Sequence, residues 1–128
     1  MAVRAFLVED NASIRDSLIE ALEELAGITT AGTAATERAA VAWLGDPANE
    51  WDLAIVDLTL EPGGSGFGVL RALQHRQAHR KVVVLTGTAN PQVRAQCEGL
   101  GSDAVFDKAI ETDALMDFCL ALSRGAGR

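Results

Sequence analysis

Cationic residues are scarce in this chain, in which 11 Lys and Arg stand against 18 Asp and Glu for a net charge of −7. So acidic a balance does not suit a protein that must neutralise nucleic-acid phosphates, and no polybasic segment is present to attract an acidic membrane. Long hydrophobic runs are missing too. The first apolar run, residues 5–8, is shorter than the roughly 7–15 residues of a secretory signal core, and no stretch approaches the ~20 apolar residues of a membrane span. We therefore expect a cytoplasmic protein without a direct nucleic-acid or membrane partner.

Cysteine is scarce as well, and the two residues of this type form no C-x-x-C motif. Cys97 and Cys119 each fall on an apolar stripe of a predicted helix, which favours buried free thiols in a reducing compartment. A chain of 128 residues, 48% hydrophobic and 23% charged, can bury the core of one domain without disulfides or metal. Repeats, low-complexity segments and internal linkers are also missing. We expect one domain over residues 1–122 and a flexible tail, or the start of a linker, over 123–128.

Short apolar runs alternate along the chain with longer segments of helical periodicity. The runs are rich in Val and Ile and end in polar residues, as is typical of strands buried on both faces of a parallel sheet. They cover residues 5–8, 28–31, 53–56, 82–85 and 104–106. Helices are predicted from a capping box at Ser13 to a stop at Gly27, and over residues 36–44, 68–76, 90–100 and 112–122. Five βα units in this order predict an α/β fold, a doubly wound five-stranded parallel sheet with helices on both faces.

The segment after the third predicted strand is rich in glycine, which invites comparison with phosphate-binding loops. Its G-x4-G spacing is not followed by the Lys-Ser/Thr pair of a Walker motif. Its GSG lacks the third glycine of a dinucleotide fingerprint and follows the third strand instead of the first. We interpret these glycines as residues that allow a turn and a close backbone approach, and Asp57 as the chemically important residue of the region.

Polar side chains stand where four of the predicted strands end. They are Glu9 and Asp10 after the first strand, Asp57 after the third, Thr86 at the fourth and Lys108 after the fifth. Because the carboxyl ends of parallel strands meet at one edge of a sheet, we expect these groups to share one shallow pocket. Clustered carboxylates repel one another unless a hard cation compensates, and two carboxylates with waters suit Mg²⁺. With a metal and an ammonium to neutralise phosphoryl oxygens and Asp57 as nucleophile, the set predicts phosphoryl transfer.

Two less specific interpretations stay open at this point. Acids at strand ends often cap the next helix or stay solvated, and Asp10 or Asn11 could do so at the first helix. A small-ligand module of flavodoxin-like fold, without phosphoryl chemistry, would also present polar groups at this edge. The second alternative predicts no response to Mg²⁺, which distinguishes it from a phosphoryl-transfer site.

Four segments in order, FLVEDN, LAIVDLTL, VVVLTGT and AVFDKA, resemble the receiver domain of bacterial two-component response regulators of the chemotaxis-regulator type. The resemblance covers essentially the whole chain and implies the flavodoxin-like strand order 2-1-3-4-5. It implies that Asp57 accepts a phosphoryl group from a phosphohistidine of a histidine kinase or phosphotransfer protein. Asp10 and Asp57 match the Mg²⁺-ligating carboxylates, and Glu9 matches the acid that holds metal-bound water.

The resemblance assigns roles to three further groups. Thr59 matches the residue whose backbone carbonyl binds the metal, Thr86 the hydroxyl that bonds to the phosphoryl group, and Lys108 the ammonium that pairs with it. The implied activity is a phosphorylation-controlled switch of protein–protein contacts, with phosphorylation-dependent dimerisation as one form of output. Such a domain catalyses only its own phosphorylation and dephosphorylation and is not an enzyme toward other substrates. A receiver cut from a larger regulator or a hybrid kinase fits the same residues.

Two positions near the lysine depart from the family pattern. Val105 stands three residues before the lysine, where family members carry an aromatic residue, and strand alternation points Phe106 to the opposite face. Ala109 replaces the proline that usually follows the lysine after a cis peptide bond. Because a cis bond to a non-proline costs about 2.5–4 kcal/mol, a trans bond and a reshaped loop are expected here.

A third departure lies in the glycine-rich loop. Pro62 and Gly66 each stand one residue farther from Asp57 than their family counterparts, which predicts one inserted residue around Glu61. Thr59 precedes the insertion, so its carbonyl is expected to keep its place. We expect a bulged loop that adds the Glu61 carboxylate at the rim of the site.

Overall fold

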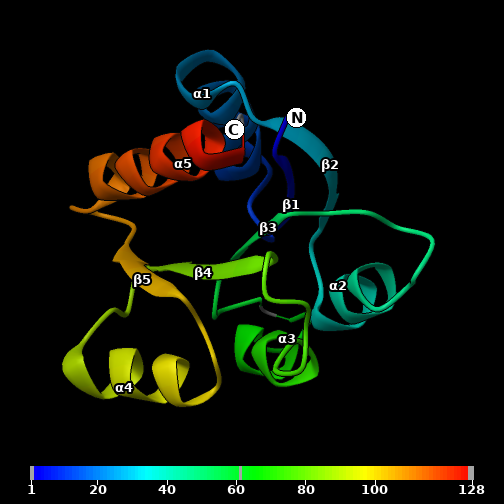
Figure 1. The fold of residues 1–128 in the computed structure, drawn as a ribbon. Helices are drawn as coiled ribbons and strands as arrows, with labels where there is room; N and C mark the ends of the chain where they lie inside the picture. The colour runs from blue at the N-terminus through cyan, green and yellow to red at the C-terminus, as the bar shows by residue number, and fades with distance from the viewer. Residues whose placement is uncertain (1, 61, 127–128) are drawn as a thin grey trace.

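The computed structural model describes residues 2–60 and 62–126, and it alternates strands with helices from one end to the other (Figure 1). The strands are β1 (Arg4–Val8), β2 (Thr29–Ala34), β3 (Leu53–Val56), β4 (Lys81–Thr86) and β5 (Ala104–Asp107). The helices are α1 (Ala12–Ala26), α2 (Glu37–Leu44), α3 (Gly66–Ala72), α4 (Pro91–Gly99) and α5 (Thr112–Ala126). The order of five βα units is the predicted one.

All strand pairs are parallel, and the sheet has the order β2-β1-β3-β4-β5. Helices α1 and α5 cover one face, and α2, α3 and α4 cover the other (Figure 1). The predicted fold class and strand order are therefore confirmed. The register pairs Val8 with Val56 and Thr86 with Asp107, so the carboxyl ends of four strands lie along one edge of the sheet.

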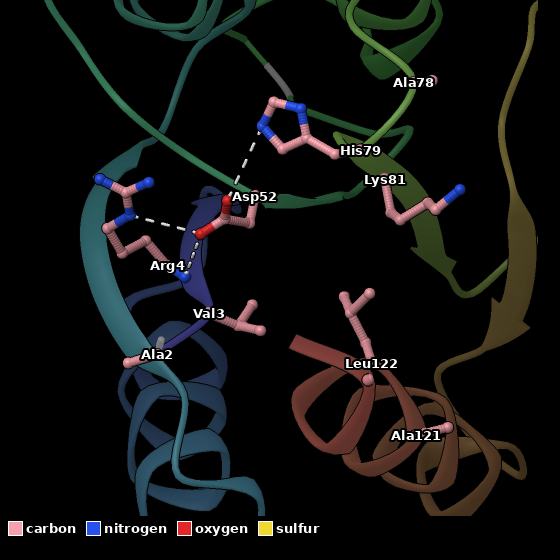
Figure 2. Close-up of a pocket in the computed structure, with 10 residues that line it drawn as sticks. Ala2, Val3, Arg4, Asp52, Ala78, His79, Lys81, Ala121 and Leu122 are labelled. Carbon is pink, nitrogen blue, oxygen red and sulfur yellow. Dashed lines mark hydrogen bonds and ion pairs between the residues drawn. The ribbon is translucent and has the colours of Figure 1, made fainter. Parts of the chain in front are cut away.

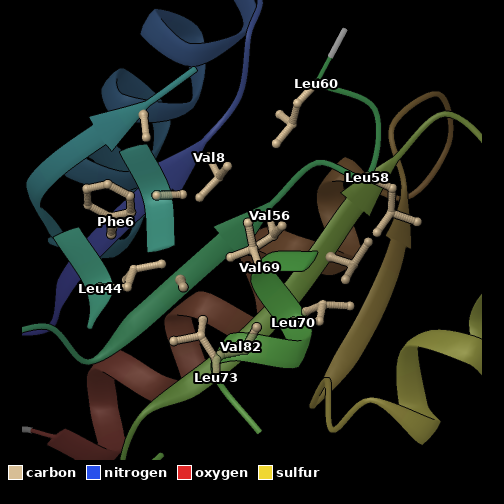
Figure 3. Close-up of a cluster of buried hydrophobic side chains, with 14 of the residues drawn as sticks. Phe6, Val8, Leu44, Val56, Leu58, Leu60, Val69, Leu70, Leu73 and Val82 are labelled. Atoms are coloured by element: carbon tan, nitrogen blue, oxygen red, sulfur yellow. The ribbon is translucent and has the colours of Figure 1, made fainter. Parts of the chain in front are cut away.

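Two separate hydrophobic clusters fill the space between the sheet and its helices. Alternate residues of the central strands contribute to each cluster, because successive side chains of a strand point to opposite faces. The cluster under α2, α3 and α4 is drawn in Figure 3 and includes Phe6, Val8, Val56, Val69, Leu70 and Val82. The cluster under α1 and α5 includes Leu7, Leu22, Ile55, Val83, Leu115 and Cys119. Strands β1, β3 and β4 are buried on both faces, which is why they appear in the sequence as continuous apolar runs.

The edge strand β2 differs from its prediction. It covers Thr29–Ala34 instead of residues 28–31, and its residues alternate between exposed and partly buried. Its register against β1 shifts between Ala5 and Phe6, so it carries an irregularity that the other pairs lack. The small and polar residues of β2 give no apolar run, and the buried Ile28 directly precedes the strand.

Helix ends are set by side-chain caps that the sequence located in most cases. Thr36 and Asn90 cap α2 and α4 as expected, and Gly27 ends α1 in the left-handed conformation with φ 64°. The capping box predicted at Ser13 is wrong. Asn11 is the N-cap of α1, and its Oδ1 accepts a hydrogen bond from the backbone N–H of Ile14 at 3.0 Å.

The third and fifth helices also differ from their predicted limits. Helix α3 begins at Gly66, capped by Ser65, and ends at Ala72, so the predicted range 68–76 is shifted toward the C-terminus. Helix α5 continues past 122 to Ala126, and the last two residues of the predicted tail, 127–128, lie outside the described residues. No helix in the described ranges is long and apolar enough to span a membrane.

Both cysteines are buried free thiols, as predicted. Burial raises the pKa of Cys119 to about 12, so this side chain stays a neutral thiol at any physiological pH. The two tryptophans pack at one side of the core. Trp43 stacks on Phe6 with ring centroids 4.3 Å apart, and buried Trp51 donates its indole N–H to the Leu44 carbonyl at 3.3 Å.

Candidate functional site

Backbone hydrogen bonds that extend the strand ladders position the predicted site residues. The N–H of Glu9 donates to the Ala34 carbonyl and that of Asp57 to the Val8 carbonyl, each at 2.9 Å. The N–H of Lys108 donates to the Thr86 carbonyl, also at 2.9 Å. The rigid sheet edge therefore fixes the backbone of these residues although up to 99 positions separate them in the chain.

An ion cluster of Glu9, Asp57 and Lys108 forms the centre of the site. Lys108 Nζ lies 2.9 Å from Asp57 Oδ2 and 3.0 Å from Glu9 Oε2. Glu9 is only 3% exposed and Asp57 5%. The single positive charge of Lys108 therefore compensates only part of the negative charge of the two buried carboxylates.

Glu9 and Lys108 both have shifted pKa values, for different reasons. Burial raises the pKa of Glu9, and the nearby Asp57 charge adds to the rise while the hydrogen bond from Lys108 opposes it. Burial alone would lower the pKa of Lys108, but the hydrogen bonds to Asp57 and Glu9 outweigh it, so this pKa is raised and the side chain stays charged.

A third carboxylate gives this site the donors of a cation site. Oxygen atoms of Glu9, Asp10 and Asp57 all lie within 4.8 Å of one another, with Asp10 on the exposed side. Thr59 lies beside them, and its backbone N–H donates to Asp57 Oδ1 at 3.3 Å. The Lys108 ammonium pairs with two of these three carboxylates, so the excess negative charge and the all-oxygen donor set suit a hard divalent cation such as Mg²⁺.

Thr86 reaches the same edge, but its hydroxyl is engaged within its own turn. It is 1% exposed and lies 3.1 Å from the Thr88 hydroxyl, and the Thr88 backbone N–H donates to it at 3.3 Å. Among the described residues its side chain makes no hydrogen bond to Asp57 or Lys108. Thr88 also lies beside the site. The sequence did not predict its contact with Thr86, for which the two-residue spacing of the hydroxyls was the only signal.

The loop after Asp57 folds back onto the strand end that carries the aspartate. Thr59 and Ser65 form an antiparallel bridge, and the Gly66 N–H donates to the Leu58 carbonyl at 3.0 Å. A Cβ at Gly66 would lie 2.1 Å from the Asp57 carbonyl oxygen, closer than any real side chain approaches. The close-approach role predicted for glycine is confirmed at Gly66.

The predicted insertion itself falls outside the described residues. Glu61, the carboxylate expected at the rim, belongs to that part of the chain, so its place stays a prediction.

Val105 and Phe106 lie on opposite faces of the sheet, as strand alternation predicted. Val105 packs in the cluster beneath α4, whereas Phe106 packs on the opposite face, with its ring centroid 6.0 Å from that of Phe118. Arg94 of α4 donates to the Val105 carbonyl at 2.9 Å and forms an ion pair with Glu111. The Arg94 guanidinium holds the pKa of Glu111 below its usual value, together with a hydrogen bond from the Asp107 N–H. The sequence did not predict this contact between α4 and the start of α5.

The opposite edge of the sheet carries a different hollow, of about 570 Å³ (Figure 2). Asp52 there accepts hydrogen bonds from the backbone N–H and the Nε of Arg4, at 2.9 and 3.3 Å, and lies 3.9 Å from His79 Nε2. Aliphatic side chains such as Val3 and Leu122 form the rest of the wall. This hollow lies at the amino ends of the strands, away from the carboxylate cluster.

The fold is a doubly wound parallel sheet with three carboxylates, a threonine and a lysine at its carboxyl edge. The family model described as "Response regulator receiver domain" matches residues 5–119, and the chain belongs to this family of two-component signalling domains. Comparison with curated proteins finds no significant match.

Solved structures of low sequence identity share the fold. The receiver domain of the Francisella response regulator 1452 is 20% identical, with a TM-score of 0.81 and coverage of 97% of this chain and 98% of that one. The BeF3-activated receiver domain of DrrB, a Thermotoga maritima protein, is 20% identical, with a TM-score of 0.76 and full coverage of both chains. The phosphorylated cyanobacterial phytochrome response regulator RcpA is 24% identical, with a TM-score of 0.76 and coverage of 95% and 91%.

Proposed function

We propose that this chain is a phosphorylation-controlled switch in which Asp57 accepts a phosphoryl group from a phosphohistidine. The observation that carries the proposal is the ion cluster, in which a buried aspartate lies between one ammonium and two further carboxylates at the open edge of a parallel sheet. The phosphorylated RcpA and BeF3-activated DrrB structures are consistent with this chemistry in the same fold.

The reaction is a transfer between two nucleophiles. An Asp57 carboxylate oxygen attacks phosphorus, the P–O bond forms as the P–N bond to histidine breaks, and the electron pair of that bond stays on the imidazole nitrogen. The Lys108 ammonium, already 2.9 Å from Asp57 Oδ2, neutralises charge on the phosphoryl oxygens. The Thr86 hydroxyl turns from Thr88 to donate to the same group.

A divalent cation completes this set. Asp10 and Asp57 would hold it with their carboxylates, Glu9 would hold a metal-bound water, and Thr59 would contribute its backbone carbonyl. A bound Mg²⁺ would supply positive charge that stabilises the transferring phosphoryl group.

The proposed partners are those that membership of the receiver family implies. The donor is a histidine kinase or a phosphotransfer protein in the cytoplasm, and the output is a change of protein contacts, with dimerisation as one form of it. The domain modifies only itself and has no other substrate. The same site serves a stand-alone regulator and a receiver within a larger regulator or hybrid kinase.

Labelling by a small-molecule phosphodonor such as phosphoramidate tests the proposal. Intact mass spectrometry should detect one phosphoryl group on the native chain in the presence of Mg²⁺, and none on Asp57→Asn. The control Asp117→Asn removes an exposed aspartate of α5 and should label like the native chain. Labelling of Asp57→Asn at the native rate would show that another residue is the nucleophile.

A second measurement separates the switch from a small-ligand module of the same fold. In amide NMR spectra with Mg²⁺, beryllofluoride should shift the resonances of Asp57, Thr86 and Lys108. A spectrum that stays unchanged with both additions would favour the small-ligand module.

A further inference from the structure

We propose that Glu37, the first residue of α2, is a positioning residue whose carboxylate holds the loop after Asp57 in the shape that phosphorylation requires. The inference rests on the proposed function of Asp57 and extends it to a residue on a different βα unit. Glu37 does not reach the ion cluster and acts through the backbone of the loop.

Reciprocal hydrogen bonds join the start of α2 to this loop. Glu37 Oε1 accepts the backbone N–H of Ser65 at 2.9 Å, and the Glu37 N–H donates to the Gly63 carbonyl at 2.8 Å. Thr36 caps the helix by accepting the Ala39 N–H at 3.1 Å, so the position from which Glu37 reaches out is itself fixed. The loop and the helix start therefore hold each other at two points.

Gly64 in the loop and Gly68 in α3 provide the space that the Glu37 side chain occupies. A Cβ at Gly68 would lie 2.2 Å from Glu37 Oε2, and a Cβ at Gly64 would lie 2.8 Å from Glu37 Cβ. Gly64 has φ +102°, which alone favours glycine, but Gly68 lies inside α3 and has no such backbone reason. Glycine is unfavourable within a helix, so its presence at 68 is explained by the carboxylate that takes the place of a side chain.

A short path leads from this carboxylate to the phosphoacceptor. Ser65, held by Glu37, is bridged to Thr59, and the Thr59 N–H donates to Asp57 Oδ1 at 3.3 Å. Thr59 is also the residue whose carbonyl we assign to the metal. Without Glu37 the segment from 63 to 65 loses one of its two anchors, and the orientation of Thr59 and of the Asp57 carboxylate becomes less restricted.

An acidic residue in the first turn of a helix also interacts favourably with the helix dipole, and this is the alternative role for Glu37. The two roles make different demands on the side chain. The dipole needs its negative charge, whereas the loop needs an oxygen acceptor of the same length. Glu37→Gln keeps the acceptor and removes the charge, and Glu37→Ala removes both.

Gly68→Ala provides an independent variant in which Glu37 is retained. The added methyl takes the place of the carboxylate, which must swing away from Ser65, while alanine favours the helical conformation of α3. This variant should therefore impair the site without a loss of thermal stability. Loss of folding cannot account for such a result.

Two measurements on the full chain test the proposal. The first is amide hydrogen exchange of Ser65 by NMR in the absence of metal, and the second is the rate of phosphorylation by phosphoramidate as a function of Mg²⁺ concentration. We expect faster Ser65 exchange and phosphorylation slower by about 10-fold in Glu37→Ala and Gly68→Ala, because a misplacement of about 1 Å can cost about 100-fold and the loss of one of two anchors displaces the reacting groups by less. Glu37→Gln should stay within about twofold of the native chain on both, as should the control Glu24→Ala, which removes an exposed glutamate of α1.

The results separate failure of this inference from failure of the proposed function. Equal defects in Glu37→Gln and Glu37→Ala would assign Glu37 to the helix dipole and overturn the inference, as would native Ser65 exchange in Glu37→Ala. A native chain that takes no phosphoryl group would instead overturn the function proposed for Asp57, and Ser65 exchange would still decide whether Glu37 holds the loop.

Discussion

Replacement of Lys108 by Met tests how much the ion cluster contributes to stability. The substitution keeps an unbranched side chain of similar length but removes the ammonium that lies 2.9 and 3.0 Å from two buried carboxylates. Removing one partner of a buried ion pair costs about 3–5 kcal/mol, because the remaining charges are left uncompensated. The Lys108 side chain is 22% exposed, so the lower end of the range, about 3 kcal/mol at pH 8 without metal, is the expected loss. In a chain of this size that corresponds to a decrease in Tm of roughly 10 °C.

The loss should depend on pH in a defined direction. The pKa of Glu9 is already raised in the folded native chain, and loss of the ammonium raises it further. A carboxyl whose folded pKa lies above its unfolded value binds more protons in the folded state, so stability falls as pH rises between the two values. Below the unfolded value, about 4.3 for Glu, both states are protonated and the penalty from Glu9 disappears. The difference between Lys108→Met and the native chain should therefore be largest near pH 8 and shrink toward pH 4.5.

Urea denaturation at pH 8, 6 and 4.5 measures this difference, with and without Mg²⁺. Mg²⁺ should stabilise the variant more than the native chain, because the cation replaces part of the lost positive charge. Lys81→Met, which removes the only other lysine of the chain at the opposite edge of the sheet, is the matched control. A variant as stable as the native chain at pH 8, or a loss that is the same at all three pH values, would refute this account of the cluster.

Three further predictions test individual features of the structure. Gly66→Ala would place a Cβ 2.1 Å from the Asp57 carbonyl oxygen, so we expect the free energy of unfolding in urea to fall by about 2–4 kcal/mol and phosphorylation to be lost. A folded variant that is still phosphorylated would contradict the described loop. Asn11→Ala should lower the free energy of unfolding by about 1 kcal/mol, whereas Ser13→Ala should have no comparable effect, because Asn11 is the N-cap of α1. A larger loss in Ser13→Ala than in Asn11→Ala would support the capping box predicted at Ser13. Cys119, with a pKa near 12, should react with a thiol reagent at pH 8 only as fast as the native chain unfolds, and rapid labelling would argue against its burial.

The elements buried on two faces were the most predictable from the sequence. Strands β1, β3 and β4 lie in the middle of the sheet, so each leaves an unbroken apolar run with limits within one residue of the observed ones. Strand β2 lies at the edge and buries little, and its small polar residues carry no comparable pattern. The start of α3 was predicted at Gly68, two residues late, because Gly66 has low helix propensity and owes its place to the close approach of the Asp57 carbonyl.

In the candidate site too, the sequence predicted what the topology of the sheet determines and missed what single side-chain contacts determine. The sequence predicted that Glu9, Asp57 and Lys108 meet, because the topology of a parallel sheet alone brings strand ends together. It did not predict the orientation of the Thr86 hydroxyl, which lies 3.1 Å from the Thr88 hydroxyl. Nothing local to Glu37 indicates that its carboxylate reaches a loop 28 residues farther along the chain.

The contact between Lys108 and Glu9 joins residues 99 positions apart, and Lys108 follows the last strand of the sheet. Lys108 is therefore the last residue of the ion cluster to be synthesised, and a chain that ends before β5 lacks the ammonium that pairs with Glu9 and Asp57. Under the function proposed for Asp57, competence to accept a phosphoryl group should require the final βα unit.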